Sequence, residues 1–132
     1  MPTNIEIRNG VIEATFHGKV TGEDLRQVLG TLRELESRLE VTPNRISDMS
    51  DAVVVELRSS EVVAFAESRG IAKLKNKIKS AIIAPGATQY GLARMFLAYN
   101  QNPDIEIMIF KDSASAYDWI GLEPKSIDKQ IH

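Results

Sequence analysis

The dipeptide Asn9-Gly10 constrains the fold of this chain more than any other feature, because it predicts a tight turn between two strands. Apolar and polar residues alternate on both sides of it, over residues 5–8 and 11–17. Asn and Gly tolerate the two positive φ angles of a type I′ turn, whose twist matches that of the flanking strands. We therefore expect a β-hairpin with one apolar and one polar face, and His17 on the polar face.

A first helix is expected after the hairpin. Thr21 can cap it through its hydroxyl, and Asp24, three residues later, completes a capping-box-like pair. Apolar residues then follow at helical spacing up to Leu39. Thr42-Pro43 stops this helix, because the residue before a proline is disfavoured in the α region.

The middle of the chain predicts a second helix. Residues 50–58 contain three consecutive valines between an aspartate and a serine pair, and we interpret them as an extended loop. Ser59 and Ser60 are both suitable N-caps for a helix that runs from Glu61 towards Lys75. Gly70 can end this helix early, since glycine disfavours helix interiors.

A short, continuous apolar run, Ser80–Ala84, is closed by Pro85-Gly86. This pattern is typical of a strand that is buried on both faces, and we expect it to be central in the sheet. The remaining predicted elements are strands over residues 45–49 and 105–109, a third helix that begins at Thr88, and a short fourth helix capped by Asp112 or Ser113.

Together these elements predict a single α/β domain over residues 1–122, followed by a polar tail over residues 123–132. The order β-β-α-β-α-β-α-β-α gives a mixed five-stranded sheet with four helices, and the last three strands should be parallel through right-handed crossovers. The length of 132 residues is typical of one domain. The composition, 43% hydrophobic and 26% charged, is that of an ordinary globular protein.

Charge and composition exclude several classes of function. The chain has 16 basic and 18 acidic residues, so it lacks the positive excess of a nucleic-acid-binding protein. It contains no cysteine, which excludes disulfides and thiolate metal sites and suits a reducing compartment. The N-terminus lacks the features of a secretory signal, and no apolar stretch is long enough to span a membrane. We expect a cytoplasmic protein without a membrane span or a nucleic-acid partner.

Catalytic and metal sites are not expected. His17 is predicted on an exposed strand face and His132 is the last residue, so neither is a convincing general base. No spacing of histidine or acidic residues suggests a metal site, and we expect no cofactor. The chain is therefore predicted to be non-enzymatic.

The carboxyl ends of the parallel strands gather the candidate ligand-binding residues, because ligands bind at that edge of open parallel sheets. The backbone N–H groups at the start of the third helix could hold an anion there, helped by Arg94. Alternatively, Thr88 only caps the helix and Arg94 forms a surface ion pair. The candidate residues of this strand-end cleft are Asp48, Ser50, Thr88, Tyr90, Arg94 and Lys111.

The order of elements, with Asp48-Met49-Ser50 closing the middle strand and serines opening the next helix, resembles the STAS domains of anti-sigma-factor antagonists. The segment Tyr90–Phe96, with the sequence YGLARMF, is similar to a segment of a group of uncharacterised bacterial STAS-like (SpoIIAA-like) proteins. The resemblance covers nearly the whole chain. It implies a STAS-type fold and a non-enzymatic regulatory domain that binds a protein partner.

The resemblance also implies a candidate phosphoacceptor. In phosphorylated STAS domains, a serine at the start of the second helix accepts phosphate, and the added charge blocks partner docking. Ser59 or Ser60 occupies the matching place here, although Ser60 is followed by Glu61 where those domains carry glycine. The alternative function is a small-ligand or anion sensor that uses the strand-end cleft. A homodimer is compatible with the apolar surface expected around Tyr99.

Overall fold

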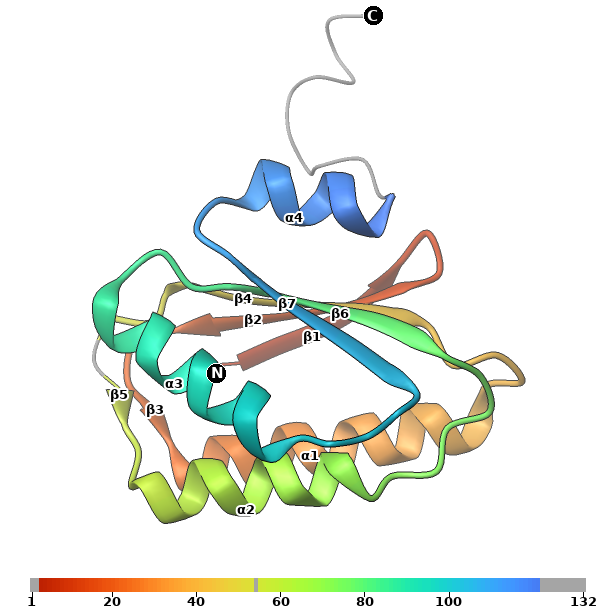
Figure 1. The fold of residues 1–132 in the computed structure, drawn as a ribbon, viewed down its shortest axis with the longest axis horizontal. Helices are drawn as coiled ribbons and strands as arrows, with labels where there is room; N and C mark the ends of the chain where they lie inside the picture. The colour runs from red at the N-terminus through yellow and green to blue at the C-terminus, as the bar shows by residue number, and fades with distance from the viewer. Residues whose placement is uncertain (1–2, 54, 122–132) are drawn as a thin grey trace, which may run out of the picture.

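The computed structural model describes residues 3–53 and 55–121. Its main sheet has five strands: β1 (Thr3–Arg8), β2 (Val11–His17), β4 (Asn44–Asp51), β6 (Ile78–Ile83) and β7 (Ile105–Phe110). Their order in the sheet is β1-β2-β4-β6-β7 (Figure 1). β1 and β2 are antiparallel, and the other neighbouring pairs are parallel, so the predicted mixed sheet is confirmed.

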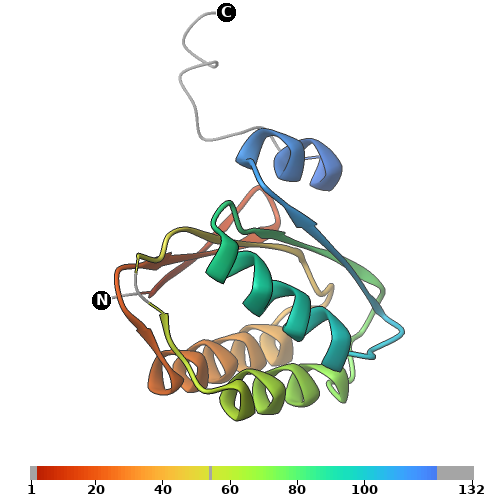
Figure 2. The same ribbon diagram turned by 60° about the vertical axis from the view of Figure 1, so that its left-hand side comes forward.

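Helices cover both faces of this sheet. One face carries three helices, and the other carries a single short one (Figures 1 and 2). The three are α1 (Gly22–Arg38), α2 (Ser59–Gly70) and α3 (Ala87–Tyr99), and the single helix is α4 (Ser113–Ile120). The sheet is therefore the middle layer of the fold, and its two faces contribute to different cores.

The hairpin turn is as predicted. Asn9 has φ 51° and Gly10 has φ 74°, the two positive values that a type I′ turn requires. The prediction of one apolar and one polar hairpin face is wrong for β2, because α4 covers the face that was expected to be polar. On that face Glu13 is only 5% exposed, whereas His17 at the strand end is exposed as predicted.

The cap of α1 is also as predicted. The backbone N–H of Thr21 donates to Asp24 Oδ2 over 2.7 Å, and the backbone N–H of Asp24 donates to Thr21 Oγ1 over 3.4 Å. The helix ends at Arg38, earlier than Thr42-Pro43, because the backbone is already extended at Leu39.

The predicted start of α2 is wrong. The N-cap is Arg58, whose backbone N–H donates to the Glu61 side chain over 2.9 Å. Ser59 and Ser60 therefore lie inside the first turn and do not cap it. The Glu61 side chain reaches back to the N–H of the N-cap residue, as the acidic member of a capping box does, and Gly70 ends the helix.

The start of α3 differs from the prediction by one residue. The helix begins at Ala87, with Gly86 as the N-cap residue. The Gln89 side chain accepts a hydrogen bond from the Gly86 N–H over 2.8 Å, so Thr88 is not the cap. In α4, Asp112 is the cap and accepts from the backbone N–H of Ser115 over 2.7 Å.

Residues 50–58 are not entirely a loop. β4 continues to Asp51, and a two-residue strand, β5 (Val55–Glu56), pairs in parallel with β3 (Val20–Thr21). This small second sheet joins the start of α1 to the start of α2, and pairing of the backbone groups explains why this valine-rich segment is extended. The predicted tail over residues 123–132, with His132, lies outside the described residues.

The strand β6 is buried on both faces, as predicted, and it is the fourth of the five strands. Ile82 packs in the core beneath α3, and Ile83 packs in the core beneath α4. These two adjacent residues of one strand therefore lie on opposite faces of the sheet.

Candidate functional site

The strand-end cleft predicted from the sequence is brought together in part. Tyr90 lies beneath two cations: the Arg94 guanidinium carbon is 5.9 Å from its ring centroid, and Lys111 Nζ is 5.4 Å from it. Asp48 accepts a hydrogen bond from the backbone N–H of Ser50 over 2.9 Å. These residues lie at the strand-end edge of the sheet, and binding of an anion there stays a prediction.

The start of α3 is tied to the end of β4. Gln89 Nε2 donates to the backbone carbonyl of Ala52 over 2.7 Å, and the same side chain accepts from the Gly86 N–H. Thr88 is exposed beside this contact. Gln89 therefore holds the predicted cleft edge through hydrogen bonds within the protein.

Both predicted phosphoacceptors are accessible. Ser59 and Ser60 are exposed in the first turn of α2. Glu61 follows them and directs its carboxylate back to the Arg58 N–H. A phosphate on either serine would share this helix start with an acidic side chain.

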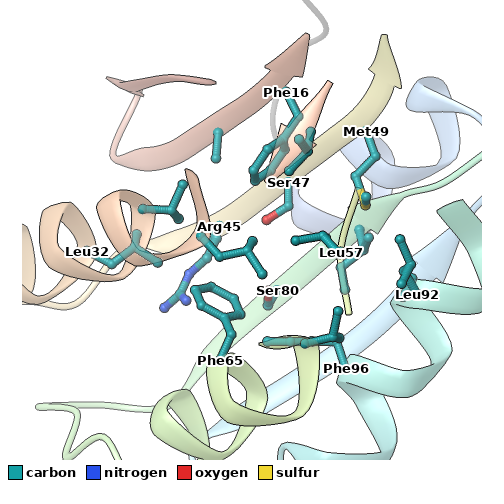
Figure 3. A pocket seen from close by; sticks show the side chains of 17 residues that line it. Phe16, Leu32, Arg45, Ser47, Met49, Leu57, Phe65, Ser80, Leu92 and Phe96 are labelled. Carbon is teal, nitrogen blue, oxygen red and sulfur yellow. The ribbon is translucent and has the colours of Figure 1, made fainter. Parts of the chain in front are cut away.

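The most distinctive site is an interior cavity of about 90 Å³ between the sheet and the layer formed by α1, α2 and α3. Its floor is formed by side chains from β2, β4 and β6, and Phe16, Met49 and Ile82 are among them. Leu32, Phe65, Leu92 and Phe96 from the three helices close it from the other side (Figure 3). Sequence reasoning missed this cavity, because it results from how the helices meet above the sheet.

The described lining of the cavity is apolar except for three residues, Arg45, Ser47 and Ser80. They are neighbours on the floor. Arg45 and Ser80 are register partners on β4 and β6, and Ser47 follows Arg45 on the same face of β4. Figure 3 shows the two hydroxyl groups and Arg45 among the surrounding apolar side chains. We call these three residues the polar strip.

Arg45 belongs to a buried charge cluster at one side of the cavity. Its Nη2 donates to Glu36 Oε2 over 3.0 Å. Arg69 binds the same carboxylate with two hydrogen bonds of 3.1 and 2.5 Å. The side chains of Arg45, Arg69 and Glu36 are 6%, 1% and 11% exposed. Two buried guanidinium groups thus share one carboxylate.

The cluster is electrostatically unbalanced. Burial and, to a smaller extent, the positive charge of Arg69 lower the pKa of Arg45, Glu36 opposes both effects, and the net result is a pKa of about 10. Within the part of the chain that the structure describes, the Nε atoms of Arg45 and Arg69 are buried without a hydrogen-bond partner. Two guanidinium groups and one carboxylate give the cluster a formal excess of one positive charge.

A groove between α1 and α2 leads towards the cavity. Leu25 and Phe65 line both the groove and the cavity. The rest of the groove lining combines apolar residues such as Leu29 with the polar residues Arg26, Ser60, Glu61 and Ser68. Arg33 Nη2 donates to Ser68 Oγ over 2.7 Å. The groove and the cavity are therefore adjacent at Leu25 and Phe65.

The opposite face of the sheet holds a second buried polar cluster. Arg8 Nε pairs with Glu13 Oε2 over 2.6 Å, and the Tyr117 hydroxyl donates to Glu13 Oε1 over 2.9 Å. Burial, followed by the hydrogen bond and charge of Glu13, raises the pKa of Tyr117 to about 12. This cluster anchors α4 to the hairpin.

The described residues offer neither a metal-binding cluster nor a membrane-spanning helix. Over residues 3–53 and 55–121, no group of three or more histidine, cysteine or acidic side chains is placed to hold a metal ion. No helix in this part of the chain combines the length and apolar character needed to cross a membrane.

Comparison with known proteins identifies the fold. No protein-family model and no curated protein matches the chain. Among solved structures, it is similar to an uncharacterised protein of the DUF3478 family with a SpoIIAA-like fold, from Shewanella loihica PV-4. The two share 22% sequence identity over 89% of this chain and 91% of the other, with a TM-score of 0.58. This chain has a SpoIIAA-like fold. The STAS-type fold implied by the sequence resemblance is thereby confirmed.

Proposed function

We propose that this SpoIIAA-like domain is a non-enzymatic module that binds a small, largely apolar molecule between its sheet and its three-helix layer. The observation that carries the proposal is the interior cavity of about 90 Å³ with its apolar lining. Well-packed protein interiors contain few voids larger than a water molecule. Dry apolar cavities of this order of size take up small apolar molecules.

The groove between α1 and α2 supports the proposal, because it offers a path to the cavity. A ligand entering there has to displace the side chains of Leu25 and Phe65, which line both spaces. Side-chain rotation is a small rearrangement compared with unfolding of a helix.

Two adjacent isoleucines of β6 give a direct test. Ile82 lines the cavity, whereas Ile83 faces the core beneath α4. On titration with 1-butanol, a molecule small enough for this cavity, methyl NMR should show a shift of the Ile82 signals at concentrations that leave the Ile83 signals unchanged. Unchanged Ile82 signals at saturating 1-butanol would contradict the proposal.

A substitution that fills the cavity provides the second test. Ala93→Leu adds three carbon atoms to a buried lining residue of α3 and should abolish the Ile82 response to 1-butanol. The matched control is Ala98→Leu, which makes the same change at an exposed position of the same helix. The control should respond as the wild type does.

A protein interaction controlled by phosphorylation is the second candidate function. It is favoured by the exposure of Ser59 and Ser60 at the start of α2. Intact-mass and affinity-purification mass spectrometry of the chain from its native cells would show phosphate on one of them together with a partner. An unmodified chain without a partner would leave ligand binding as the function.

The cellular setting is part of the same proposal. We place the domain in the cytoplasm, where a protein partner would respond to the ligand-bound form. Leu97 and Tyr99 are exposed on α3 and offer an apolar surface for self-association into a homodimer. Light scattering with Tyr99→Ser as the variant tests the homodimer: the variant should be the smaller particle.

A further inference from the structure

The buried charge cluster defines what kind of molecule the cavity would bind. Two guanidinium groups and one carboxylate leave an excess of one positive charge in the interior. An uncompensated buried charge is costly, and a charge that is retained there calls for a counter-charge. Among the described residues, the nearest carboxylate, Glu36, is already shared by both arginines.

Arg45 is the member of the cluster that reaches the cavity. It lines the cavity wall, and its Nε has no hydrogen-bond partner in the described part of the chain. Arg69 is fully buried, and it is not part of the lining. Arg45 is therefore the member of the cluster at which a molecule in the cavity would meet the excess charge.

The two serines of the polar strip provide hydroxyl donors beside Arg45. Strand register places Ser80 opposite Arg45, and strand alternation places Ser47 two residues further on the same face. A guanidinium group and neighbouring hydroxyl groups form a donor set that suits a planar carboxylate. The rest of the described lining is apolar.

Resting on the ligand-binding function proposed above, we propose that the ligand is an amphipathic carboxylic acid, with its apolar body in the cavity and its carboxylate at Arg45, Ser47 and Ser80. The ligand's charge balances the cluster at two guanidinium groups and two carboxylates. A neutral alcohol leaves the excess positive charge in place, and an ammonium ion adds to it.

Three test ligands share one four-carbon tail, which suits the cavity volume, and differ only in the charge of the head group: butanoate, 1-butanol and butylamine. At pH 7 butanoate is anionic and butylamine is cationic. The Ile82 methyl signals report the binding of each. Butanoate should bind wild-type protein roughly tenfold or more tightly than 1-butanol, because a hydrogen bond to a charged group is stronger than one between neutral groups. Butylamine should bind most weakly.

Arg45→Met assigns the preference to its residue. The variant keeps a side chain of similar length and leaves Arg69 and Glu36 as a balanced pair. It should bind butanoate no more tightly than 1-butanol. The matched control, Arg38→Met, removes an exposed arginine of α1 that lines neither the cavity nor the groove, and should retain the butanoate preference. Ser80→Ala should reduce the preference by a smaller factor.

The outcomes separate this inference from the proposed function. If 1-butanol moves the Ile82 signals and butanoate binds no more tightly, the cavity is a ligand site but the carboxylate assignment is overturned. A preference for butanoate that survives in Arg45→Met also overturns it. If no test ligand moves the Ile82 signals, the ligand-binding function itself fails. The wild-type series decides the question even where a variant does not fold.

Discussion

The two faces of the sheet bury the same kinds of charged group but balance them differently. Beneath α4, one arginine, Arg8, pairs with one carboxylate, Glu13. Beneath α1 and α2, Arg45 and Arg69 share Glu36. Each face leaves a guanidinium nitrogen without a described partner, so imperfect hydrogen bonding is common to both. The excess charge and the cavity occur together on one face only.

This difference separates the tasks of the two faces. On the α4 face, a neutral pair and the Tyr117 hydroxyl join the hairpin to the last helix, and the contacts are explained by stability alone. On the other face, a strand position that could hold an apolar side chain holds Arg45, next to space that the core leaves empty. Stability alone does not explain that arrangement, whereas the anionic ligand proposed above would.

Removal of the shared carboxylate should have the largest effect. Glu36→Gln keeps the size of the side chain but leaves two buried guanidinium groups without a counter-charge, so the free energy of unfolding should fall by roughly 3–5 kcal/mol. Urea denaturation followed by circular dichroism measures this loss. The control Glu34→Gln changes an exposed residue of the same helix and should cost less than about 0.5 kcal/mol. A small loss for Glu36→Gln would show that the excess charge is not buried as described.

One substitution, Arg→Met, should act oppositely on the two faces. Arg8→Met leaves Glu13 buried with only the Tyr117 hydroxyl, and we expect a loss of about 2–3 kcal/mol. Arg45→Met removes the excess charge and leaves a balanced pair, so stability should be unchanged or higher by about 1 kcal/mol. Both values come from urea denaturation at pH 7. Equal losses for the two variants would contradict the distinction between the faces.

How much of this could be predicted from the sequence depends on the distance between the interacting residues. Asn9-Gly10 and the Thr21–Asp24 cap act over a few residues, and both predictions were confirmed. Glu13 was predicted to lie on a polar, exposed face. In the structure it is covered by Tyr117, which lies 104 residues further along the chain. No local sequence pattern indicates a contact over that separation.

The cavity escaped prediction for a related reason. Its volume depends on how three helices meet, and Arg45 in an alternating strand resembles an ordinary exposed residue until α1 and α2 cover it. A usable signal existed in Ser47 and Ser80, since polar or small residues at inward positions of buried strands leave space. The strand-end residues Tyr90, Arg94 and Lys111 lie close together in the structure, because parallel strands end at the same edge, and their role in ligand binding stays a prediction.

The smallest expected effect concerns the response of the α4 face to alkaline pH. The folded state raises the pKa of Tyr117 to about 12, whereas an unfolded tyrosine has a pKa near 10. Below pH 10 both states keep the proton and the stabilisation is fully present. As pH rises from 10 to 12, the unfolded state releases the proton first, so the free energy of unfolding should fall by about 1–2 kcal/mol through this group.

Tyr117→Phe should lack this part of the loss when urea denaturation is repeated across that pH range. Tyr99→Phe, which removes an exposed hydroxyl from α3 on the other face, should keep it. An identical pH dependence in wild type and Tyr117→Phe would mean that the hydroxyl does not stabilise the Arg8–Glu13 pair, and the α4 face would then depend on its apolar contacts and its ion pair alone.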